Sequence, residues 1–128
     1  MRRNISTNSS SEIKVGYSRA VLVNGRVYVS GTTSTNEPGN TVGKSVYDQA
    51  THCFKKVLSA IKSAGFTADD VVSVTAYLVD MKRIEEFDRA FAEHFFEVKP
   101  CCTLVGIKDL VREDLLVEIE CVAEKAED

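Results

Sequence analysis

The stretch VVSVTAYLVD, residues 71–80, decides the fold of this chain. Apolar side chains stand at both odd and even positions along it, so neither face of the expected strand is polar. A strand that is apolar on both faces is typical of the interior of a sheet that is covered on both sides. The residues around this stretch must therefore supply both its neighbouring strands and the layers that cover them.

Helical patterns lie on both sides of this strand. The earlier one begins at Ser45, a residue type that caps helices, and apolar residues recur at helical spacing through residues 46–61. Gly65 fits the position just beyond the end of that helix. The later pattern covers about residues 82–96, with apolar and aromatic residues along one side, and Pro100 ends it. The strand is therefore expected between two amphipathic helices.

A hairpin is expected before the first helix, and two more strands are expected after the second. The hairpin is AVLVNGRVYVSG, residues 20–31, in which Asn24-Gly25 suits a type I′ turn because both residues tolerate positive φ. The late strands are expected near residues 101–107 and 115–123. The resulting order is ββαβαββ, which predicts an α+β fold with one mixed sheet.

The two helical connections should both be right-handed, which places both helices on the same face of the sheet. The opposite face then has no helix to cover it, although the alternation of side chains assigns it several apolar residues: Val71, Tyr77, Val79, Leu104 and Leu116. A partly apolar face without a covering layer is typical of a surface that another subunit covers. We therefore expect a homo-oligomer, whose subunit number this pattern leaves open.

Size, charge and composition argue against several classes of protein. A chain of 128 residues with 44% hydrophobic residues is expected to form one domain with an ordinary core. No apolar run is long enough for a membrane span. The net charge of −3 and the scattered basic residues argue against a nucleic-acid surface, and no paired set of acid–base histidines suggests RNA cleavage. We expect no nucleic-acid partner and no membrane association.

The N-terminal residues indicate an arm outside the folded domain. Residues 1–14, MRRNISTNSSSEIK, are basic and then rich in Ser and Asn, without the apolar segment of a secretory signal. We expect a flexible arm over residues 1–14 and a single domain over residues 15–128. The absence of a secretory signal in this segment indicates a reducing, cytoplasmic setting. Because the chain also has enough apolar residues to form a core without disulfides, we expect its cysteines to be free.

Two adjacent cysteines begin the strand within KPCCTLVG, residues 99–106. Side chains alternate across a strand, so Cys101 and Cys102 point to opposite faces. Cys101 shares its face with the valine and isoleucine of this strand, which predicts that it packs in the core, as does Cys121. Cys102 is then expected on the opposite face, together with Glu118.

Other roles for these cysteines need neighbours that the sequence does not place beside them. A metal site needs several converging ligands, and neither histidine stands at a ligand spacing from them, so we expect no metal. A vicinal disulfide would need a strained turn inside a strand. A nucleophilic or redox-active Cys102 would need a base or a lowered pKa, and this alternative stays open.

Three stretches resemble the Rid (YjgF) family. They are VGYSRAVLVNGRVYVSGTT, VVSVTAYLVDMKRIEEFDRAFAEHF and the ending from KPCCT to LVEIE, and the resemblance covers about residues 15–123. The family has a chorismate-mutase-like α+β fold and forms homotrimers with ligand pockets between subunits. It has also been labelled ribonuclease or translation inhibitor. The resemblance implies the same fold, a homotrimer and a small-molecule partner for this chain.

The best-known members of this family hydrolyse reactive imines and enamines to a 2-keto acid and ammonia, without a cofactor. Carried over by motif, the resemblance implies that Glu118 positions or activates water. It implies that Tyr17 and the pair Ser30-Gly31 form part of the substrate pocket. It places an arginine that holds the substrate carboxylate at position 102.

This chain departs from the family pattern at Cys102. A thiol cannot give a carboxylate the two charge-assisted hydrogen bonds of an arginine, so activity on small 2-imino acids is in doubt. Arg19, close to the motif that supplies Tyr17, is a candidate replacement cation. We therefore predict an imine or enamine hydrolase of the deaminase type, with an altered substrate preference and no cofactor. The alternative is a non-catalytic protein that binds a metabolite or has a regulatory role.

Overall fold

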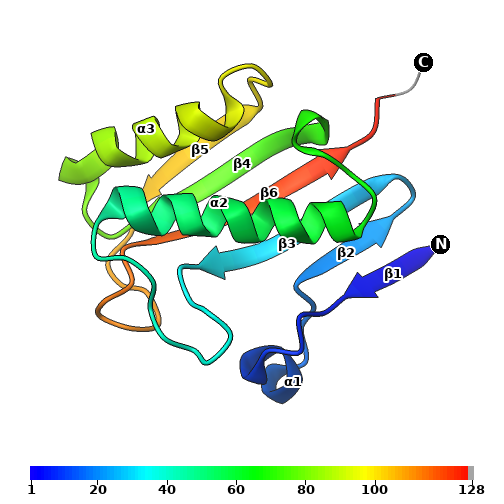
Figure 1. Cartoon of the computed structure of the whole chain (residues 1–128), viewed down its shortest axis with the longest axis horizontal. Helices are drawn as coiled ribbons and strands as arrows, with labels where there is room; N and C mark the ends of the chain where they lie inside the picture. The colour runs from blue at the N-terminus through cyan, green and yellow to red at the C-terminus, as the bar shows by residue number, and fades with distance from the viewer. Residues whose placement is uncertain (127–128) are drawn as a thin grey trace.

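Six strands form one mixed sheet in the computed structural model, which describes residues 1–126, and their order is β1-β2-β3-β6-β4-β5 (Figure 1). The elements, with η for a 3-10 helix, are β1 (Arg2–Ile5), α1 (Ser10–Val15), β2 (Ala20–Val23), β3 (Arg26–Thr33), α2 (Val46–Ser63), η1 (Ala68–Asp70), β4 (Val71–Leu78), η2 (Met81–Arg83), α3 (Ile84–Phe95), β5 (Cys101–Gly106) and β6 (Val117–Glu124). Neighbouring strands are antiparallel except for β4 and β5. The predicted α+β fold with a mixed sheet is confirmed, with one more strand and one more helix at its start.

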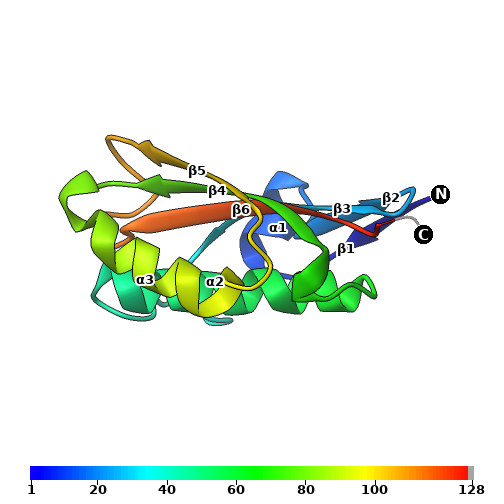
Figure 2. The same cartoon turned by 90° about the horizontal axis from the view of Figure 1, so that it is seen from above.

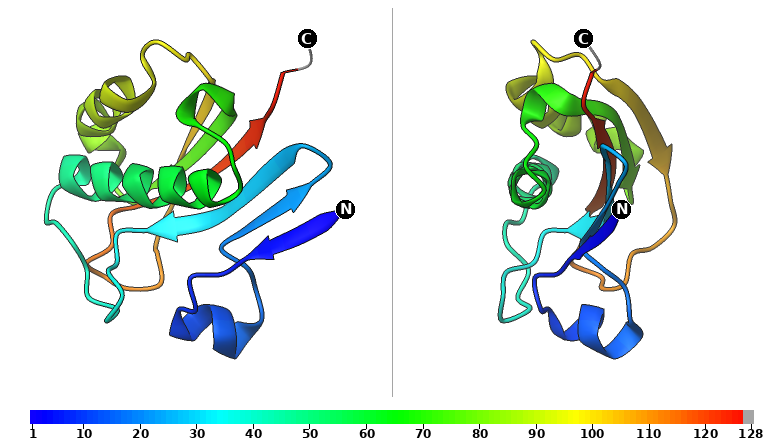
Figure 3. Two further views of the ribbon diagram at one scale, coloured as in Figure 1. Left: turned by 45° about the vertical axis from the view of Figure 1, so that its right-hand side comes forward. Right: turned by 90° about the vertical axis from the view of Figure 1, so that its right-hand side faces the viewer.

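The two long helices, α2 and α3, lie on the same face of the sheet (Figure 2). α2 connects β3 to β4 and α3 connects β4 to β5, as two right-handed crossovers require. The short helix α1 lies apart from them, at the end of the sheet near β1 and β2 (Figure 3). The face opposite α2 and α3 is left without a long helix, as the sequence predicted.

The turn and the helix ends follow the local signals in the sequence. Asn24 and Gly25 have φ values of 48° and 80°, so both turn residues of the β2–β3 hairpin have the positive φ of a type I′ turn. The Ser45 side chain caps α2 by accepting a hydrogen bond from the backbone amide of Asp48. Gly65, with a φ of 86°, follows the end of that helix and lets the chain reverse.

Phenylalanines fill the space between the helices and the sheet. Phe54 of α2 packs against Phe87 and Phe95 of α3, with ring centroids 6.0 and 5.3 Å apart. All three are fully buried, and Cys121 of β6 is buried in the same core, as predicted. Burying one such ring contributes about 1.5–3 kcal/mol relative to an exposed one. The aromatic stripe in the sequence therefore holds both helices on one face.

The N-terminal residues do not form the flexible arm that we expected. β1 pairs with β2 along its whole length, and Ser9 caps α1 by accepting a hydrogen bond from the amide of Glu12. The Glu12 side chain is 4% exposed, and it accepts hydrogen bonds from the Ser6 hydroxyl and from the amide and hydroxyl of Thr7. The polar residues that indicated a flexible arm are thus the hydrogen-bond donors that hold residues 6–12 around the buried Glu12 carboxylate.

The cysteines of β5 face the opposite way from our expectation. In the register with β4, Cys102 lies beside Val74 and Leu104 lies beside Ala76, and these β4 residues are buried beneath the helices. Cys102 therefore lies on the helix side of the sheet, and Cys101 is exposed on the other side instead of packing in the core. β5 is an edge strand, so its valine does not mark the core face as it would in a central strand.

The open face is also more polar than the alternation of residues suggested. Tyr77 lies there as expected, and its hydroxyl donates to a glutamate of β6. Val71 is only 3% exposed, because the pairing of β4 with β6 shifts register just after it. Leu104 and Leu116 pack against the core, and Val79 follows the end of β4. The carboxylates of β6 make this face more polar than the sequence pattern predicted.

Candidate functional site

A hollow of about 1210 Å³ lies beside β3, between the N-terminal segment and one side of α2. Tyr17, Arg19, Gly31 and Glu118 all line it, so the structure brings together four of the six site residues predicted from the sequence. Residues 5–12, the loop after β3 and α2 form its other walls. A concave site of this size that contains several polar groups is the usual form of a small-molecule site.

The hollow exists because β3 continues beyond its neighbour β2. The pairing of these strands stops where Ala20 lies opposite Val29, and the register of β3 with β6 shifts between Val29 and Thr32. Thr32 and Thr33 still pair with β6, but no strand covers their other edge. A bulge at this place ends the pairing and re-aims the side chains that follow it.

The carboxylate of Glu118 packs directly over Gly31. Glu118 lies on β6 opposite Thr33, and a Cβ at position 31 would stand only 2.5 Å from Glu118 Oε2. Burial raises the pKa of Glu118, while the positive charge of Arg19 acts in the opposite direction. A half-buried carboxylate with a raised pKa that lines a hollow is suited to exchanging protons with a ligand.

Arg19 brings a buried positive charge to the same hollow. Its side chain is 8% exposed, Nη2 donates to the carbonyl of Gly31 at 2.8 Å, and Nε has no hydrogen-bond partner. Its Cζ lies 5.9 Å from the centroid of the Tyr17 ring, and within residues 1–126 it forms no ion pair. The charge of Arg19 acts on Glu118, but no acidic side chain of residues 1–126 lies within ion-pair distance of the guanidinium, and a buried charge without a close counter-ion is costly. The site therefore favours an anionic group beside Arg19.

Ser30 supports the site from behind instead of lining it. Its hydroxyl donates to the carbonyl of Ser18 at 2.6 Å, and its amide donates to the carbonyl of Arg19 at 2.9 Å. These two hydrogen bonds hold the chain that precedes β2 against β3. Ser30 thus positions the backbone that carries Arg19, and its hydroxyl is already engaged.

Cys102 lies far from this hollow within one chain. β6 and β4 separate β5 from β3, so with strands about 4.8 Å apart the two strands are about 14 Å apart. The thiol is exposed at the sheet edge, yet partial burial and the nearby Asp88 raise the pKa of Cys102. A raised pKa keeps the thiol protonated, which argues against the nucleophilic role considered above.

Sequence reasoning missed five ionisable side chains that line the hollow, of which Glu37 and Lys55 are exposed and Glu12, His52 and Lys56 are not. Lys56 Nζ donates to the carbonyls of Thr33 and Thr35, at 2.8 and 3.0 Å, and to the Thr35 hydroxyl at 3.2 Å. Burial lowers the pKa of Lys56. The sequence contained a signal for the position of Lys56. It lies three residues after Cys53, which is buried, so it borders the buried side of α2.

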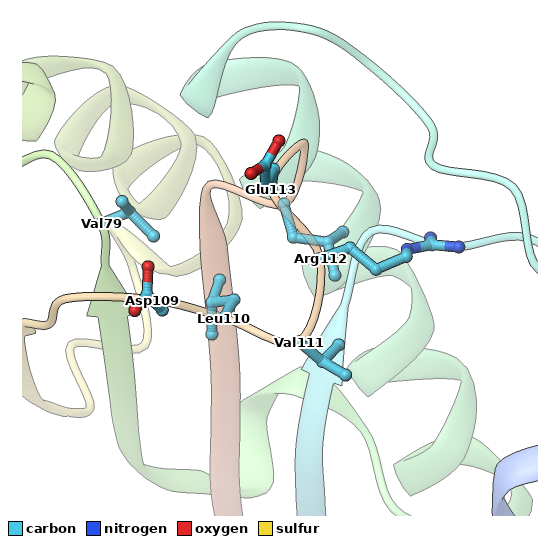
Figure 4. A pocket seen from close by; sticks show the side chains of 7 residues that line it. Val79, Asp109, Leu110, Val111, Arg112 and Glu113 are labelled. Carbon is cyan, nitrogen blue, oxygen red and sulfur yellow. The ribbon is translucent and has the colours of Figure 1, made fainter.

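A second, smaller hollow of about 130 Å³ lies beside the loop between β5 and β6 (Figure 4). Asp109, Arg112 and Glu113 are among its lining residues. Arg112 extends away from it, and its guanidinium donates to the carbonyl of Gly39 and the hydroxyl of Thr41. Because the volume is small and the arginine is already engaged, the larger hollow is the candidate site.

Two searches of the described part of the chain complete the description of the site. Within residues 1–126, no three His, Cys, Asp or Glu side chains come together as metal ligands could. In the same residues, no helix combines the length and the apolar character that crossing a bilayer requires.

Comparison with known proteins identifies relatives along almost the whole chain. Residues 8–125 match the family model described as endoribonuclease L-PSP. A RutC family protein of Aquifex aeolicus is 34% identical over 85% of this chain and 88% of its own length. Protein MMF1 of Saccharomyces cerevisiae, whose name describes it as mitochondrial, is 31% identical over 92% of this chain and 82% of its own.

Solved structures agree with these sequence matches. The crystal structure of Rv2704 from Mycobacterium tuberculosis, described as a member of the YjgF/YER057c/UK114 family, superposes with a TM-score of 0.90. It is 33% identical and covers 98% of this chain and 100% of its own. The similarity therefore extends to the whole domain, including the N-terminal strand and helix.

Proposed function

This chain belongs to the endoribonuclease L-PSP family, also called YjgF, RutC or Rid, and we propose that it hydrolyses an imine or enamine in the large hollow. The Rid resemblance of the sequence is thereby confirmed, and family membership supports a small-molecule-binding role. One observation carries the catalytic proposal. The half-buried Glu118 carboxylate packs on Gly31 beside the buried, unpaired Arg19.

The proposed reaction adds water across a C=N bond and releases a carbonyl compound and ammonia. Glu118 takes a proton from the water as its oxygen attacks the imine carbon, and it returns that proton to the nitrogen, which gives a carbinolamine. It then moves the hydroxyl proton of the carbinolamine to the nitrogen as the C=O bond forms, the C–N bond breaks and ammonia leaves. Burial raises the pKa of Glu118, which makes it a better proton acceptor than an exposed carboxylate. Arg19 holds an anionic group of the substrate, and Tyr17 forms the adjacent wall.

The assembly that we propose is a homotrimer, as the family resemblance implies. Support comes from the open sheet face, where Tyr28 and Val105 are 45% and 38% exposed, and from the edge of β5, which has no partner strand among residues 1–126. Unpaired strand edges and partly apolar faces are commonly covered by another chain. The family resemblance places position 102 in a pocket between subunits, so in such an assembly Cys102, at the edge strand β5, would border the hollow of a neighbouring copy.

The absence of an arginine at position 102 changes what the substrate can be. Cys102 cannot form a bidentate pair with a carboxylate, and losing such a pair removes about 2–3 kcal/mol of binding. The buried Arg19 replaces this charge from within the chain that also supplies Glu118. We therefore expect an imine hydrolase with an altered substrate preference and no cofactor.

A non-catalytic metabolite-binding protein is the alternative, and Cys102 is the observation that favours it. If the missing arginine were required for turnover, the hollow would still bind an anion through Arg19. Cleavage of RNA, the activity in the family description, has less support from the geometry. His94 Nδ1 donates to the carbonyl of Ala90 in its own helix, and of the two histidines of the chain only His52 lines the hollow.

The compartment stays a prediction. The sequence indicated a cytoplasmic protein, whereas the name of the relative MMF1 describes that protein as mitochondrial. Fractionation of cells that express the full chain, with detection by antibody, measures where this protein resides. A mitochondrial signal would contradict the cytoplasmic prediction without bearing on the chemistry of the hollow.

The test of the proposed function is hydrolysis of an imine generated in the assay. Purified protein is added to freshly formed 2-iminopropanoate, and release of pyruvate and ammonia is followed. We expect turnover by the native protein and at least a hundredfold loss in Glu118→Gln. Glu120→Gln is the matched control, because Glu120 lies on the same strand and accepts its hydrogen bond from Tyr77 on the open face.

The comparison with Cys102→Arg separates the remaining outcomes. A silent native protein together with an active Cys102→Arg variant would show a working hollow that prefers other substrates. Equal turnover by Glu118→Gln and native protein would refute the assigned role of Glu118. Silence of all variants on several imines, with retained ligand binding, would establish the binding protein instead of the enzyme.

A further inference from the structure

The geometry points to a substrate with two anionic groups, most simply a 2-imino dicarboxylic acid. This inference rests on the hydrolase function proposed above and names its substrate class. It begins from two cations that line the same hollow, Arg19 of the segment before β2 and Lys56 of α2. Neither side chain forms an ion pair with any residue from 1 to 126.

Arg19 is the first cation, and it is built into the wall. Its side chain is more than nine-tenths buried, its Nε hydrogen has no acceptor, and one Nη2 hydrogen is used by the carbonyl of Gly31. The guanidinium has five N–H donors, so several stay available for a ligand. A carboxylate is the group that matches this planar set of donors.

Lys56 is the second cation, and only neutral atoms surround its ammonium group. Its three contacts are the carbonyls of Thr33 and Thr35 and the Thr35 hydroxyl, so its hydrogen bonds are satisfied, while the negative charge of Glu12 acts on it only from beyond ion-pair distance. Burial and the positive charge of Arg19 both lower the pKa of Lys56. An anionic group could replace the longest of these contacts, the one of 3.2 Å to the hydroxyl, and offset the charge.

The other buried acid of the hollow does not pair with Lys56. Glu12 is 4% exposed, and its two carboxylate oxygens accept hydrogen bonds from Ser6 and Thr7. Burial alone would raise the pKa of Glu12, but these hydrogen bonds outweigh it and lower that pKa. Glu12 is therefore committed to holding the N-terminal segment. Its charge raises the pKa of Lys56 from a distance, but it forms no ion pair with Lys56, so an anionic group of a ligand can still pair with the ammonium.

The spacing of the two cations is set by β3. Arg19 binds the carbonyl of Gly31 and Lys56 binds that of Thr33, two residues further along the strand. Two residues of a strand span about 7 Å, so the two carbonyls that hold the cations are about that far apart. A dicarboxylic acid of four or five carbons in an extended form places its carboxylates at a comparable separation.

Glu118 lies level with the same two residues of β3. Its carboxylate is over Gly31 and its backbone is opposite Thr33. A substrate with its first carboxylate on Arg19 and its second on Lys56 would therefore have its imine carbon beside Glu118. Water adds to that carbon, the imine nitrogen leaves as ammonia, and a 2-oxo dicarboxylate remains with both carboxylates unchanged.

The experiment compares ligands that differ by one carboxylate. Succinate and butyrate have the same number of carbons, and isothermal titration of the native protein measures the affinity of each. We expect succinate to bind at least tenfold more tightly than butyrate. Lys56→Gln should reduce this ratio to near one. Lys62→Gln is the matched control, because Lys62 is exposed on the same helix and does not line the hollow.

Lys56→Arg is the control for a structural effect of Lys56→Gln. Lys56 also ties Thr33 and Thr35 to α2, so Lys56→Gln could loosen this loop. Arginine keeps the charge and the donors, and we expect the preference for succinate to persist in Lys56→Arg. Loss of the preference in Lys56→Arg with a native circular dichroism spectrum would overturn the role of the Lys56 charge.

Turnover separates the substrate class from the hydrolase function. 2-Iminosuccinate and 2-iminopropanoate are each generated by an amino-acid oxidase, and semicarbazide traps the imine that escapes hydrolysis. We expect the native protein to hydrolyse 2-iminosuccinate at least tenfold faster than 2-iminopropanoate. A binding preference for succinate without any hydrolysis would refute the proposed function and support the ligand class. Equal binding of succinate and butyrate, with either imine hydrolysed, would overturn the ligand class and keep the function.

Discussion

A methyl group added at Gly31 should separate the function of Glu118 from the stability of the fold. The ideal Cβ of Gly31→Ala would lie 2.5 Å from Glu118 Oε2 and 3.0 Å from its Cδ. The φ of Gly31 lies outside the left-handed region, so alanine fits the backbone. The carboxylate must therefore move while the strand keeps its conformation.

The size of the movement follows from these distances. An ordinary contact begins at about 3.4 Å, so an atom at 2.5 Å has to retreat by about 1 Å. The end of a glutamate side chain rotates easily, and we expect a loss of only about 1 kcal/mol in the free energy of unfolding. A misplacement of about 1 Å at a reacting group costs about a hundredfold in rate, which corresponds to about 2.7 kcal/mol of barrier.

The assay measures both quantities on the same samples. Urea unfolding followed by circular dichroism gives the stability of native protein and Gly31→Ala, and imine hydrolysis gives kcat/KM. Gly106→Ala, at the end of β5, is the control, because its added Cβ would lie 2.7 Å from Cγ of Met81 in η2, a comparable clash against another flexible side chain. We expect Gly106→Ala to lose stability while keeping its activity.

One pattern of results would refute the reasoning. If Gly31→Ala keeps full activity with unchanged stability, the Glu118 carboxylate is not held over Gly31 as the structure shows. If Gly31→Ala and Gly106→Ala lose activity equally, the loss reflects general destabilisation and not the displacement of Glu118. A loss of activity confined to Gly31→Ala supports the assigned role.

Three further predictions use the titration and accessibility of single groups. Burial raises the pKa of Glu118, so a pH profile of kcat/KM should fall on the acid side at a pH above 4.5, and Arg19→Met should move this limb still higher because it removes the opposing charge. Hydrogen bonds lower the pKa of Glu12, so the ionised Glu12 stabilises the N-terminal segment above pH 4.5, and this stabilisation is lost as the pH falls through the lower pKa of the folded protein. Hydrogen exchange of the N-terminal amides should therefore accelerate at acid pH. In Glu12→Gln it should be faster at all pH values, corresponding to a loss of about 2 kcal/mol of local stability. Burial raises the pKa of Cys53 and of Cys121 to about 12, so iodoacetamide should label neither until urea unfolds the protein, as read by mass spectrometry.

The fold could be predicted from the sequence wherever a strong local signal agreed with the burial pattern. The Asn24-Gly25 turn, the Ser45 cap and the phenylalanines of α3 each had a short-range physical cause, and the structure confirms all of them. The faces of β5 were predicted wrongly, because alternation shows only that Cys101 and Cys102 oppose each other. Which of the two faces the helices depends on the pairing of β5 with β4, a contact between distant residues.

The candidate site was only half predictable for a related reason. Tyr17, Gly31 and Glu118 came from a motif resemblance, and the structure places them in one hollow. Lys56 and Glu12 carry no motif, and their importance depends on which distant segments stand beside them. The N-terminus, rich in serine and asparagine, suggested a flexible arm, because composition does not show that a buried glutamate accepts hydrogen bonds from Ser6 and Thr7.

The place of the binding cation decides whether ligand binding depends on assembly. An arginine at position 102 would stand on β5, about 14 Å from β3 in its own chain, so it could serve only the hollow of a neighbouring subunit. Arg19 and Lys56 belong to the same chain as Glu118, and they bind carbonyls of the strand that borders the hollow. Replacing Cys102 by arginine should therefore add affinity for monocarboxylates only in the assembled protein. The preference for dicarboxylates should persist on dilution, because every group that creates it comes from a single chain.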